Sequence, residues 1–223
     1  MVLNVNGSVQ DDDASALNAQ AIELCQQRKY AEAEPLLKRS LAIQEETLGP
    51  DHLDVAAALN NLARFYHDQG NYAEAEPLLK RALAIREKAL GPDNPDVAVA
   101  LNNLACLYQD QGNYAAAEPL FTRALAIGEK AVGPEHPDVA AALNNLARYY
   151  HVQGDYAAAE PLLKRSLAIT EKALGPDHLD VATALNNLAG LYYDQGNYAE
   201  AEPLFKRSLA IMEKALGSDH PDV

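Results

Sequence analysis

Apolar residues recur every three or four positions through most of the chain, which is the spacing that buries one face of an α-helix. In residues 51–92, one such run ends at Gln69-Gly70-Asn71, and a second begins at Tyr72 and ends at Gly91-Pro92. Glycine favours the left-handed turn that ends a helix, and proline cannot continue one. The pattern therefore predicts two amphipathic helices joined by a short turn. The apolar positions of the first helix are Val55, Leu59, Leu62, Ala63 and Tyr66.

The helix pair is repeated along the sequence. Asn60 has counterparts at 42-residue intervals, and each is followed by a Glu-Pro-Leu segment at the same offset. An interval of this size indicates one supersecondary unit stacked on copies of itself. We therefore expect an all-α solenoid of five two-helix repeats in residues 14–223, preceded by a flexible N-terminal segment, residues 1–13. The counterparts of Asn60 are Asn102, Asn144 and Asn186.

The two ends of the array differ from its middle. In the first repeat, Gln20 stands at the position of Leu62, and Arg28 stands at the position of Gly70. Divergent terminal repeats are typical of caps, so we expect the first repeat to close the array. Residues 217–223 contain the start of a sixth repeat. From this we expect the chain to be a piece of a longer array.

A proline lies inside each predicted second helix. Pro77 follows Tyr72 by five residues, and a proline in a helix interior removes a hydrogen bond at a cost of about 3 kcal/mol. We expect a local bend there; the alternative is that the second helix begins at the proline. Asn71 and Glu74 also have the spacing of a capping box. The equivalent prolines are Pro35, Pro119, Pro161 and Pro203.

Several positions resemble the tetratricopeptide repeat: Leu59, Leu62, Ala63, Tyr66, Gly70, Tyr72 and Ala75. The second helix runs one turn further than usual, and the motifs Leu-Asn-Asn-Leu-Ala and Glu-Ala-Glu-Pro-Leu look like the repeats of kinesin light chains and nephrocystin-type proteins. The resemblance implies a right-handed superhelical solenoid whose first helices line a concave wall. It does not imply association with kinesin, because the chain has no heptad coiled coil.

Composition narrows the class of partner. The chain has 18 Lys and Arg against 32 Asp and Glu, a net charge of −14, which opposes binding to nucleic acid and to anionic membranes. No segment approaches the roughly 18 apolar residues of a membrane span, and the N-terminus lacks a signal peptide. Cys25 and Cys106 lie in different repeats, too far apart for a disulfide. We therefore expect a soluble, cytoplasmic protein.

A second stripe of residues lies on the face of each first helix away from its apolar stripe. The resemblance places this stripe on the concave wall, so we expect a peptide-binding groove there. An asparagine amide both donates and accepts hydrogen bonds, and a row of them can hold the backbone of an extended peptide. The alternative is that the asparagines tie neighbouring helices together or face water. The candidate groove residues are Asn60, Arg64, His67, Asn102, Gln109, Asn144, Arg148, His151, Asn186 and Tyr193.

The charges of this stripe indicate the kind of peptide. Arg64 and Arg148 present forked donors that suit carboxylates, so we expect an acidic ligand. Acidic residues next to the His67 column oppose this expectation; they are Asp68, Asp110 and Asp194. Lysines near the ends of the second helices would add positive charge at the rim of the groove. These are Lys88, Lys130, Lys172 and Lys214.

The sequence contains no recognisable catalytic motif. There is no glycine-rich phosphate loop, no Gly-x-Ser-x-Gly and no His-Glu-x-x-His, and no set of metal ligands converges by spacing. We therefore expect neither an enzyme nor a cofactor or metal site. The predicted function is a protein-protein interaction module that binds an extended, acidic peptide. The alternative is a structural scaffold or spacer within a larger multidomain protein that self-associates through an uncapped C-terminal repeat.

Overall fold

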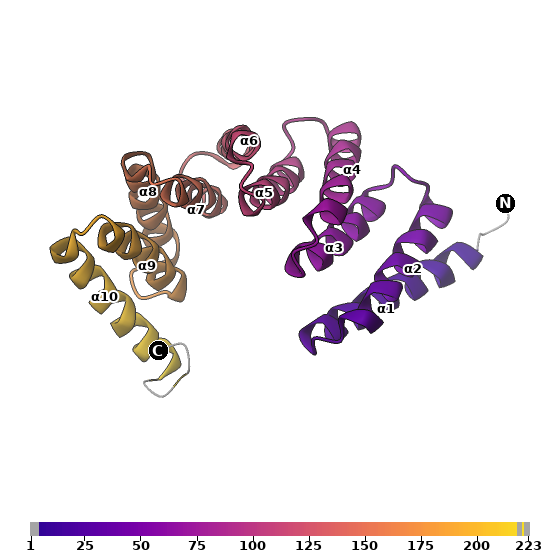
Figure 1. Cartoon of the computed structure of the whole chain (residues 1–223), viewed down its shortest axis with the longest axis horizontal. Helices are drawn as coiled ribbons and strands as arrows, with labels where there is room; N and C mark the ends of the chain where they lie inside the picture. Colours follow the sequence, from indigo (N-terminus) through magenta and orange to yellow (C-terminus); the bar gives the residue numbers. More distant parts are fainter. Residues whose placement is uncertain (1–4, 218–219, 221–223) are drawn as a thin grey trace. The chain divides into compact units, whose positions relative to one another are not determined.

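The computed structural model describes residues 5–217 and His220, with side chains described from Asp13 onward. Within these residues the chain forms ten α-helices and no strand (Figure 1). The start of a sixth repeat, expected within residues 217–223, lies almost entirely outside this part. The helices are α1 (Val5–Gln26), α2 (Tyr30–Leu48), α3 (Leu53–Asp68), α4 (Tyr72–Leu90), α5 (Pro95–Asp110), α6 (Tyr114–Val132), α7 (Pro137–Val152), α8 (Tyr156–Leu174), α9 (Leu179–Asp194) and α10 (Tyr198–Leu216).

Each repeat is one helical hairpin, so the predicted all-α repeat solenoid is confirmed. The odd-numbered helices are the first helices of the repeats, and the even-numbered helices are the second. The chain divides into two compact units, Met1–Ala117 and Glu118–Val223, with the boundary inside α6. In the first unit α1 packs on α2 and α3 on α4, while α2 and α4 also pack on α3 and α5, respectively. In the second unit α7 packs on α8, α8 on α9, and α9 on α10.

The N-terminal boundary differs from the prediction. The segment expected to be flexible, residues 1–13, is helical from Val5 onward, because α1 spans Val5–Gln26. Residues 1–4 lie outside the described part of the chain. Extending a helix adds one hydrogen bond for each residue that becomes ordered, which costs much less than nucleating a new helix. The first helix of the array therefore starts at Val5 rather than at Ala14.

Apolar columns form the core of both units. Leu59 and Leu101 in the first unit and Leu143 and Leu185 in the second have 0% exposure. Full burial of a leucine side chain contributes about 1.5–3 kcal/mol. Since these residues occupy one position of every repeat, the core of each unit is a row of equivalent contacts rather than one central cluster.

Glycine and proline separate the helices as predicted. At Gly91 φ is 86°, a left-handed conformation that glycine adopts without strain, and its N–H donates to the carbonyl of Glu87. The next helix has Pro95 at its start, where no intrahelical N–H bond is needed, and Asp96 in its first turn, where the helix dipole favours an acid.

The side-chain caps differ from the prediction. Asn71 caps α4 without a side-chain hydrogen bond, so the expected capping box with Glu74 does not form. At the equivalent position of α8, with similar backbone angles, the side chain of Asp155 does accept from the N–H of Ala158 at 3.1 Å. The first helices are capped instead by residues whose side chains accept from the N–H two positions further on. These caps are His52, Asn94, His136 and His178.

The prolines lie inside the second helices. Pro77 is within α4, which begins at Tyr72, so the alternative in which the helix begins at the proline is wrong. Pro77 is exposed, and so is Ala73, whose carbonyl lacks the N–H that a non-proline residue would supply. Water can bond to that carbonyl, which lowers the cost of the missing hydrogen bond. The local bend stays a prediction.

Arginines connect successive second helices at a fixed interval. Arg165 of α8 donates to Glu129 of α6 at 2.5 Å and to the carbonyl oxygen of Pro134 at 2.6 Å. Arg81 of α4 bonds Glu45 of α2 and the carbonyl oxygen of Pro50 in the same way. Each guanidinium therefore links two helices and also satisfies an oxygen of the connecting loop, which two parallel donors allow and a lysine would not.

A second tie joins a first helix to the preceding second helix. Tyr66 of α3 donates to Glu34 of α2 at 2.9 Å, and Lys38 lies 2.7 Å from the same carboxylate. The bonds from Lys38 and then from Tyr66 hold the pKa of Glu34 below its usual value. Tyrosine and glutamate pairs with the same spacing recur at Tyr108 with Glu76 and at Tyr192 with Glu160.

Arg28 is a position where the structure predicts a stabilising substitution. Its φ is 60°, whereas its counterparts Gly70 and Gly154 adopt 74° without strain. A left-handed non-glycine residue costs roughly 1–2 kcal/mol, which the backbone entropy of glycine partly offsets. Arg28→Gly should therefore raise the free energy of unfolding by about 0.5–1 kcal/mol, measured by urea unfolding followed by circular dichroism.

Lys29→Gly is the matched control, because it removes the same charge from the neighbouring residue at a φ of −87°. This control should leave the stability unchanged or lower it. An equal gain from both substitutions would mean that the lost charge, and not the backbone conformation, is responsible, and the prediction would be wrong.

Candidate functional site

The predicted stripe residues come from the first helices of the two units. In the first unit α3 carries Asn60, Arg64 and His67, and α5 carries Asn102 and Gln109. In the second unit α7 and α9 carry the rest of the set: Asn144, Arg148, His151, Asn186 and Tyr193. Arg64 and Arg148 are exposed, whereas Gln109 is only 6% exposed and offers little surface to a ligand.

Each unit has a hollow on this stripe. The hollow of the first unit, of about 430 Å³, is lined by Asn60, Ala63, Arg64, His67, Asp68, Leu79, Asn103 and Cys106. That of the second unit, of about 270 Å³, is lined by Asn144, Asn145, Ala147, Arg148, His151, Leu163, Asn186, Asn187 and Gly190. Most of the lining residues correspond at an interval of 84 residues, as Arg64 and Arg148 do. The two hollows are therefore equivalent sites built by alternate repeats.

The asparagines make different contacts in the two units. In the first unit Asn103 Nδ2 donates to Asn60 Oδ1 at 2.7 Å, and Asn61 Nδ2 donates to Asn18 Oδ1 at 3.1 Å. These bonds tie neighbouring first helices together, which is one of the alternatives that the sequence left open. In the second unit Asn144 Oδ1 is buried and accepts no hydrogen bond from any described residue. The hollow of the second unit thus has an acceptor without a described donor, whereas the equivalent acceptor in the first unit, Asn60 Oδ1, already receives a hydrogen bond.

Histidine and aspartate side chains form a further tie. His67 Nε2 lies 2.7 Å from Asp110 Oδ2, and His151 Nε2 lies 2.8 Å from Asp194 Oδ2. From the sequence these aspartates were expected only to oppose an acidic ligand. In the structure each is engaged by a histidine of the preceding first helix, so its charge is partly compensated. Each histidine and its aspartate are 43 residues apart, and this constant spacing is the feature of the sequence that could have indicated the pairs.

The arginines differ in their surroundings. Arg64 lines the hollow beside Asp68 and donates no hydrogen bond to another described residue. At the position equivalent to Asp68, the second unit has Val152, which is 56% exposed. The surroundings of Arg148 therefore lack one negative charge that lies beside Arg64.

The rim lysines are a correction to the sequence analysis. Lys88 lies 2.5 Å from Asp51, and Lys214 lies 2.5 Å from Asp177. Lys172 is 3.4 Å from Glu135. These acids belong to the loop of the same repeat, which passes close to the end of its second helix. The lysines therefore add little net positive charge to the rim.

The remaining candidates have ordinary surroundings. Tyr193 is 56% exposed, and its ring meets that of Tyr198 edge-on with 5.1 Å between centroids. Asn102 Oδ1 is buried and, within the described residues, has no hydrogen-bond donor. Burial raises the pKa of the Cys25 thiol, which disfavours a reactive thiolate.

Neither a metal site nor a membrane-spanning helix is found in the part of the chain that the structure describes. No three His, Cys, Asp or Glu side chains there lie together in a way that could hold a metal ion. No helix there is both long and apolar enough to cross a membrane.

These features define a class of protein. Stacked helical hairpins with a polar, hollowed face on their first helices are typical of helical-repeat proteins, which use such faces for recognition. The family follows from the sequence: the tetratricopeptide repeat model matches residues 12–66, 54–130, 107–172, 138–214 and 180–223. The chain belongs to the tetratricopeptide repeat family, which confirms the resemblance seen in the sequence.

Solved structures of the kinesin light chain type are similar over nearly the whole chain. A kinesin light chain-like protein from Podosopora anserina with nearly identical TPR-like repeats is 31% identical, with a TM-score of 0.79, and the match covers 92% of this chain and 96% of that one. BtubC (BKLC) from P. vanneervenii is 24% identical, with a TM-score of 0.77 and coverage of 97% and 91%. The second of these similarities shows the fold alone.

A more distant structure shares the same fold. A Rap protein complexed with competence and sporulation factor is 20% identical, with a TM-score of 0.72, and the match covers 91% of this chain and 54% of that one. At this identity the similarity shows the fold alone. No curated protein matches the sequence.

The asparagine ties predict unequal effects of one substitution. Asn103→Ala removes the donor to Asn60 Oδ1 and leaves a half-buried acceptor unpaired, so the free energy of unfolding should fall by about 1–2 kcal/mol. The equivalent Asn187 is exposed and bonds no described residue. Asn187→Ala should therefore change the stability by less than about 0.5 kcal/mol. Urea unfolding of both variants tests this, and equal losses would contradict it.

Proposed function

We propose that this chain is a protein-interaction module that binds an extended, acidic peptide on the first-helix stripe of each unit. Tetratricopeptide repeats generally mediate interactions between proteins, and the Rap protein of the same fold was solved in complex with competence and sporulation factor. Binding is what we propose for the stripe, because its amide and guanidinium groups suit hydrogen bonds to a peptide backbone and to carboxylates. Cys25 and Cys106 form no disulfide, which supports a reducing, cytoplasmic setting.

The observation that carries this proposal is the pair of equivalent hollows. Each combines asparagine amides with an exposed guanidinium and an imidazole. Amides can bond both the N–H and the carbonyl of a peptide backbone whatever its side chains. In the second unit no described residue donates to the buried Asn144 Oδ1, and a peptide N–H would supply a donor. The second hollow is therefore the stronger of the two proposed sites.

The acidic preference is local rather than global. The net charge of −14 repels an acidic peptide at long range, but the Debye length is only about 8 Å at physiological ionic strength. At contact distance the ligand meets Arg64 or Arg148, and a guanidinium can bond both oxygens of a carboxylate. Affinity should consequently fall as salt is added.

Reversal of the two arginine charges tests the proposal. Arg64→Glu with Arg148→Glu should lower the affinity for a pool of fluorescent acidic peptides by at least about 100-fold, since two favourable ion pairs become repulsive. Helicity and melting should change little, because both side chains are exposed. Fluorescence anisotropy measures the affinity, and circular dichroism measures the fold.

The matched control is Lys29→Glu with Arg39→Glu. These residues are exposed and are not among the candidate groove residues, and their reversal changes the net charge by the same amount. The control should retain most of the affinity. Equal affinity of the parent and the Arg64, Arg148 variant, or no binding by the parent, would remove the support for an acidic-peptide site.

A second candidate function is self-association as a scaffold, and α10 provides the observation that favours it. Phe205 is 38% exposed, whereas Phe121, at the equivalent position of α6, has 0% exposure. Leu209 on the same face is 39% exposed. Exposed apolar area drives association at about 25 cal/mol per Å². We propose that a second copy of this chain covers the face, through its own α10.

Two features favour pairing of α10 with α10. The outer face of α1 has Asp13 and Gln20, both exposed, at positions where α3 has the buried Val55 and Leu62, so it is a poor cover for an apolar helix. On α10, Lys206 and Glu213 lie on the same flank of the apolar face. Two antiparallel copies would therefore place Lys206 of one opposite Glu213 of the other.

Sedimentation velocity over a wide concentration range tests self-association. The parent should shift from monomer to dimer as its concentration rises, and Phe205→Glu should remain monomeric because it places a charge on the covered face. Val99→Glu is the control, since Val99 is 54% exposed but lies on α5; it should dimerise like the parent. A parent that stays monomeric at the highest concentration excludes this function.

A further inference from the structure

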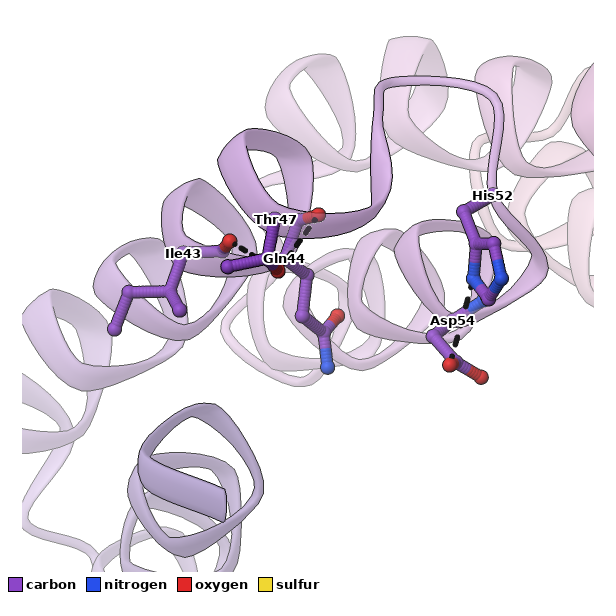
Figure 2. Close-up of polar contacts among 5 residues, drawn as sticks. All are labelled: Ile43, Gln44, Thr47, His52 and Asp54. Atoms are coloured by element: carbon purple, nitrogen blue, oxygen red, sulfur yellow. Dashed lines mark hydrogen bonds and ion pairs between the residues drawn. The ribbon is translucent and has the colours of Figure 1, made fainter. Parts of the chain in front are cut away.

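A polar hollow in the first unit lies at the other end of α3 from Arg64. It has a volume of about 330 Å³ and is lined by Ser15, Asn18, Gln44, Leu48, Asp54, Ala57, Ala58 and Asn61. Figure 2 shows two of its side chains, Gln44 on α2 and Asp54 at the start of α3. Neither was among the sequence-predicted site residues.

The hollow contains two acceptor groups, the amide oxygen of Gln44 and the carboxylate of Asp54. Gln44 Oε1 is buried and receives no hydrogen bond from a described residue. The Asp54 side chain is 64% exposed and lies 3.4 Å from His52 Nδ1, but no described lysine or arginine pairs with it. His52 Nδ1 is itself occupied, because it accepts from the backbone N–H of Asp54 (Figure 2).

Two donors close to the hollow are already used. Thr47 Oγ1 donates to the carbonyl oxygen of Ile43 at 2.8 Å (Figure 2). Asn61 Nδ2 donates to Asn18 Oδ1 at 3.1 Å. The hollow is therefore suited to a group that brings its own hydrogen-bond donors and a positive charge.

The next repeat shows what can occupy this place. Forty-two residues after Gln44 and Asp54 stand Arg86 and Asp96. Arg86 is half-buried, and its burial lowers the pKa of its guanidinium while Asp96 acts in the opposite direction. Asn60 and Asn103 are bonded there just as Asn18 and Asn61 are here. In one repeat pair a half-buried guanidinium thus lies near the acid, with its buried Nη1 bonded to no described residue. In the other pair a shorter neutral side chain stands at the same position.

We propose that the hollow between α2 and α3 binds the guanidinium of an arginine side chain from a partner segment. The Asp54 carboxylate and the Gln44 carbonyl are its acceptors. A guanidinium suits the site better than an ammonium, because it is planar, carries several donors in fixed directions and is more weakly hydrated. The guanidinium of the ligand thus takes the position that the guanidinium of Arg86 has in the next repeat.

This site is independent of the acidic-peptide proposal, because it uses other residues and the opposite charge. The two sites are nevertheless on one helix. Asp54 and Arg64 are ten residues apart on α3, which is about 15 Å at the helical rise per residue. A partner segment that carries both an acidic and a basic residue could therefore contact both ends of α3.

The test uses a small probe with the whole chain. Nα-acetyl-arginine methylamide is titrated into the ¹⁵N-labelled protein, and amide chemical shifts are followed by NMR. Saturable shifts should cluster in residues 15–18, 44–48 and 54–61, with a dissociation constant in the millimolar range expected for a small ligand. The citrulline analogue, which has the same shape but no charge, should bind at least fivefold more weakly. Equal shifts with both probes would overturn the proposal.

Three variants locate the site. Gln44→Arg should abolish the shifts, because it places the side chain found at Arg86 into the hollow. Asp54→Asn should raise the dissociation constant at least fivefold. Asp96→Asn is the matched control: it removes the same charge from the same position of the next repeat, where Arg86 lies near the acid, and should leave binding unchanged.

The outcomes distinguish a specific binding site from non-specific attraction of the probe to an acidic protein. Equal weakening by Asp54→Asn and Asp96→Asn would mean that only the net charge matters, and the proposal would be wrong. Binding that survives in a folded Gln44→Arg protein would also overturn it. Should Gln44→Arg fail to fold, Gln44→Glu replaces it: the added charge should tighten binding at least threefold, and no change would count against the site.

Discussion

Stacking of each helical hairpin on the next is the constraint on which the rest of this structure depends. A single hairpin cannot bury both faces of its second helix, so the apolar side chains of α4 and α8 are covered by α5 and α9. The effect of that cover is visible at one position: Phe121 has 0% exposure, whereas its counterpart Phe205 on α10 has 38%. The core of each unit is consequently only one repeat deep.

The polar contacts use the same period as the core. Arg81 and Arg165 each connect a second helix to the preceding one and to a loop carbonyl. Tyr66 and Tyr192 each bond a glutamate of the preceding repeat. Exposed pairs of this kind contribute little individually, but a side chain that bonds the next repeat in each copy keeps successive hairpins in one register. Stability should therefore depend mainly on neighbouring repeats.

The proposed binding sites, by contrast, depend on where the repeats differ. The apolar core positions are nearly the same in every repeat. On the stripe, one repeat has an arginine and a histidine, and the next has smaller or neutral residues. Arg64 is thus followed one repeat later by Cys106, and Arg148 by Gly190. One pair of repeats leaves Asn144 without a donor, and another replaces Arg86 by Gln44. In a periodic scaffold such departures change the charge and hydrogen bonding of a surface without disturbing the packing behind it.

The sequence by itself determined the helices, their turns and the family. The 3.6-residue apolar period, the glycine at position 91 and the proline at position 95 act locally, so each could be interpreted without a structure. The spacing of 42 residues then required equivalent hairpins to stack. Even the position of α4 around Pro77 followed from the register of Tyr72 with the apolar residues after it.

Only the tertiary structure decided which polar groups are satisfied. Asn60 and Asn144 are equivalent in the sequence, yet one accepts from Asn103 and the other has no described donor. Lys88 is a second example. The sequence predicted that it adds positive charge at the rim of the groove, whereas in the structure it pairs with Asp51. Such pairs form between residues more than thirty positions apart. Their geometry depends on how two hairpins pack, which hydrophobic periodicity does not specify.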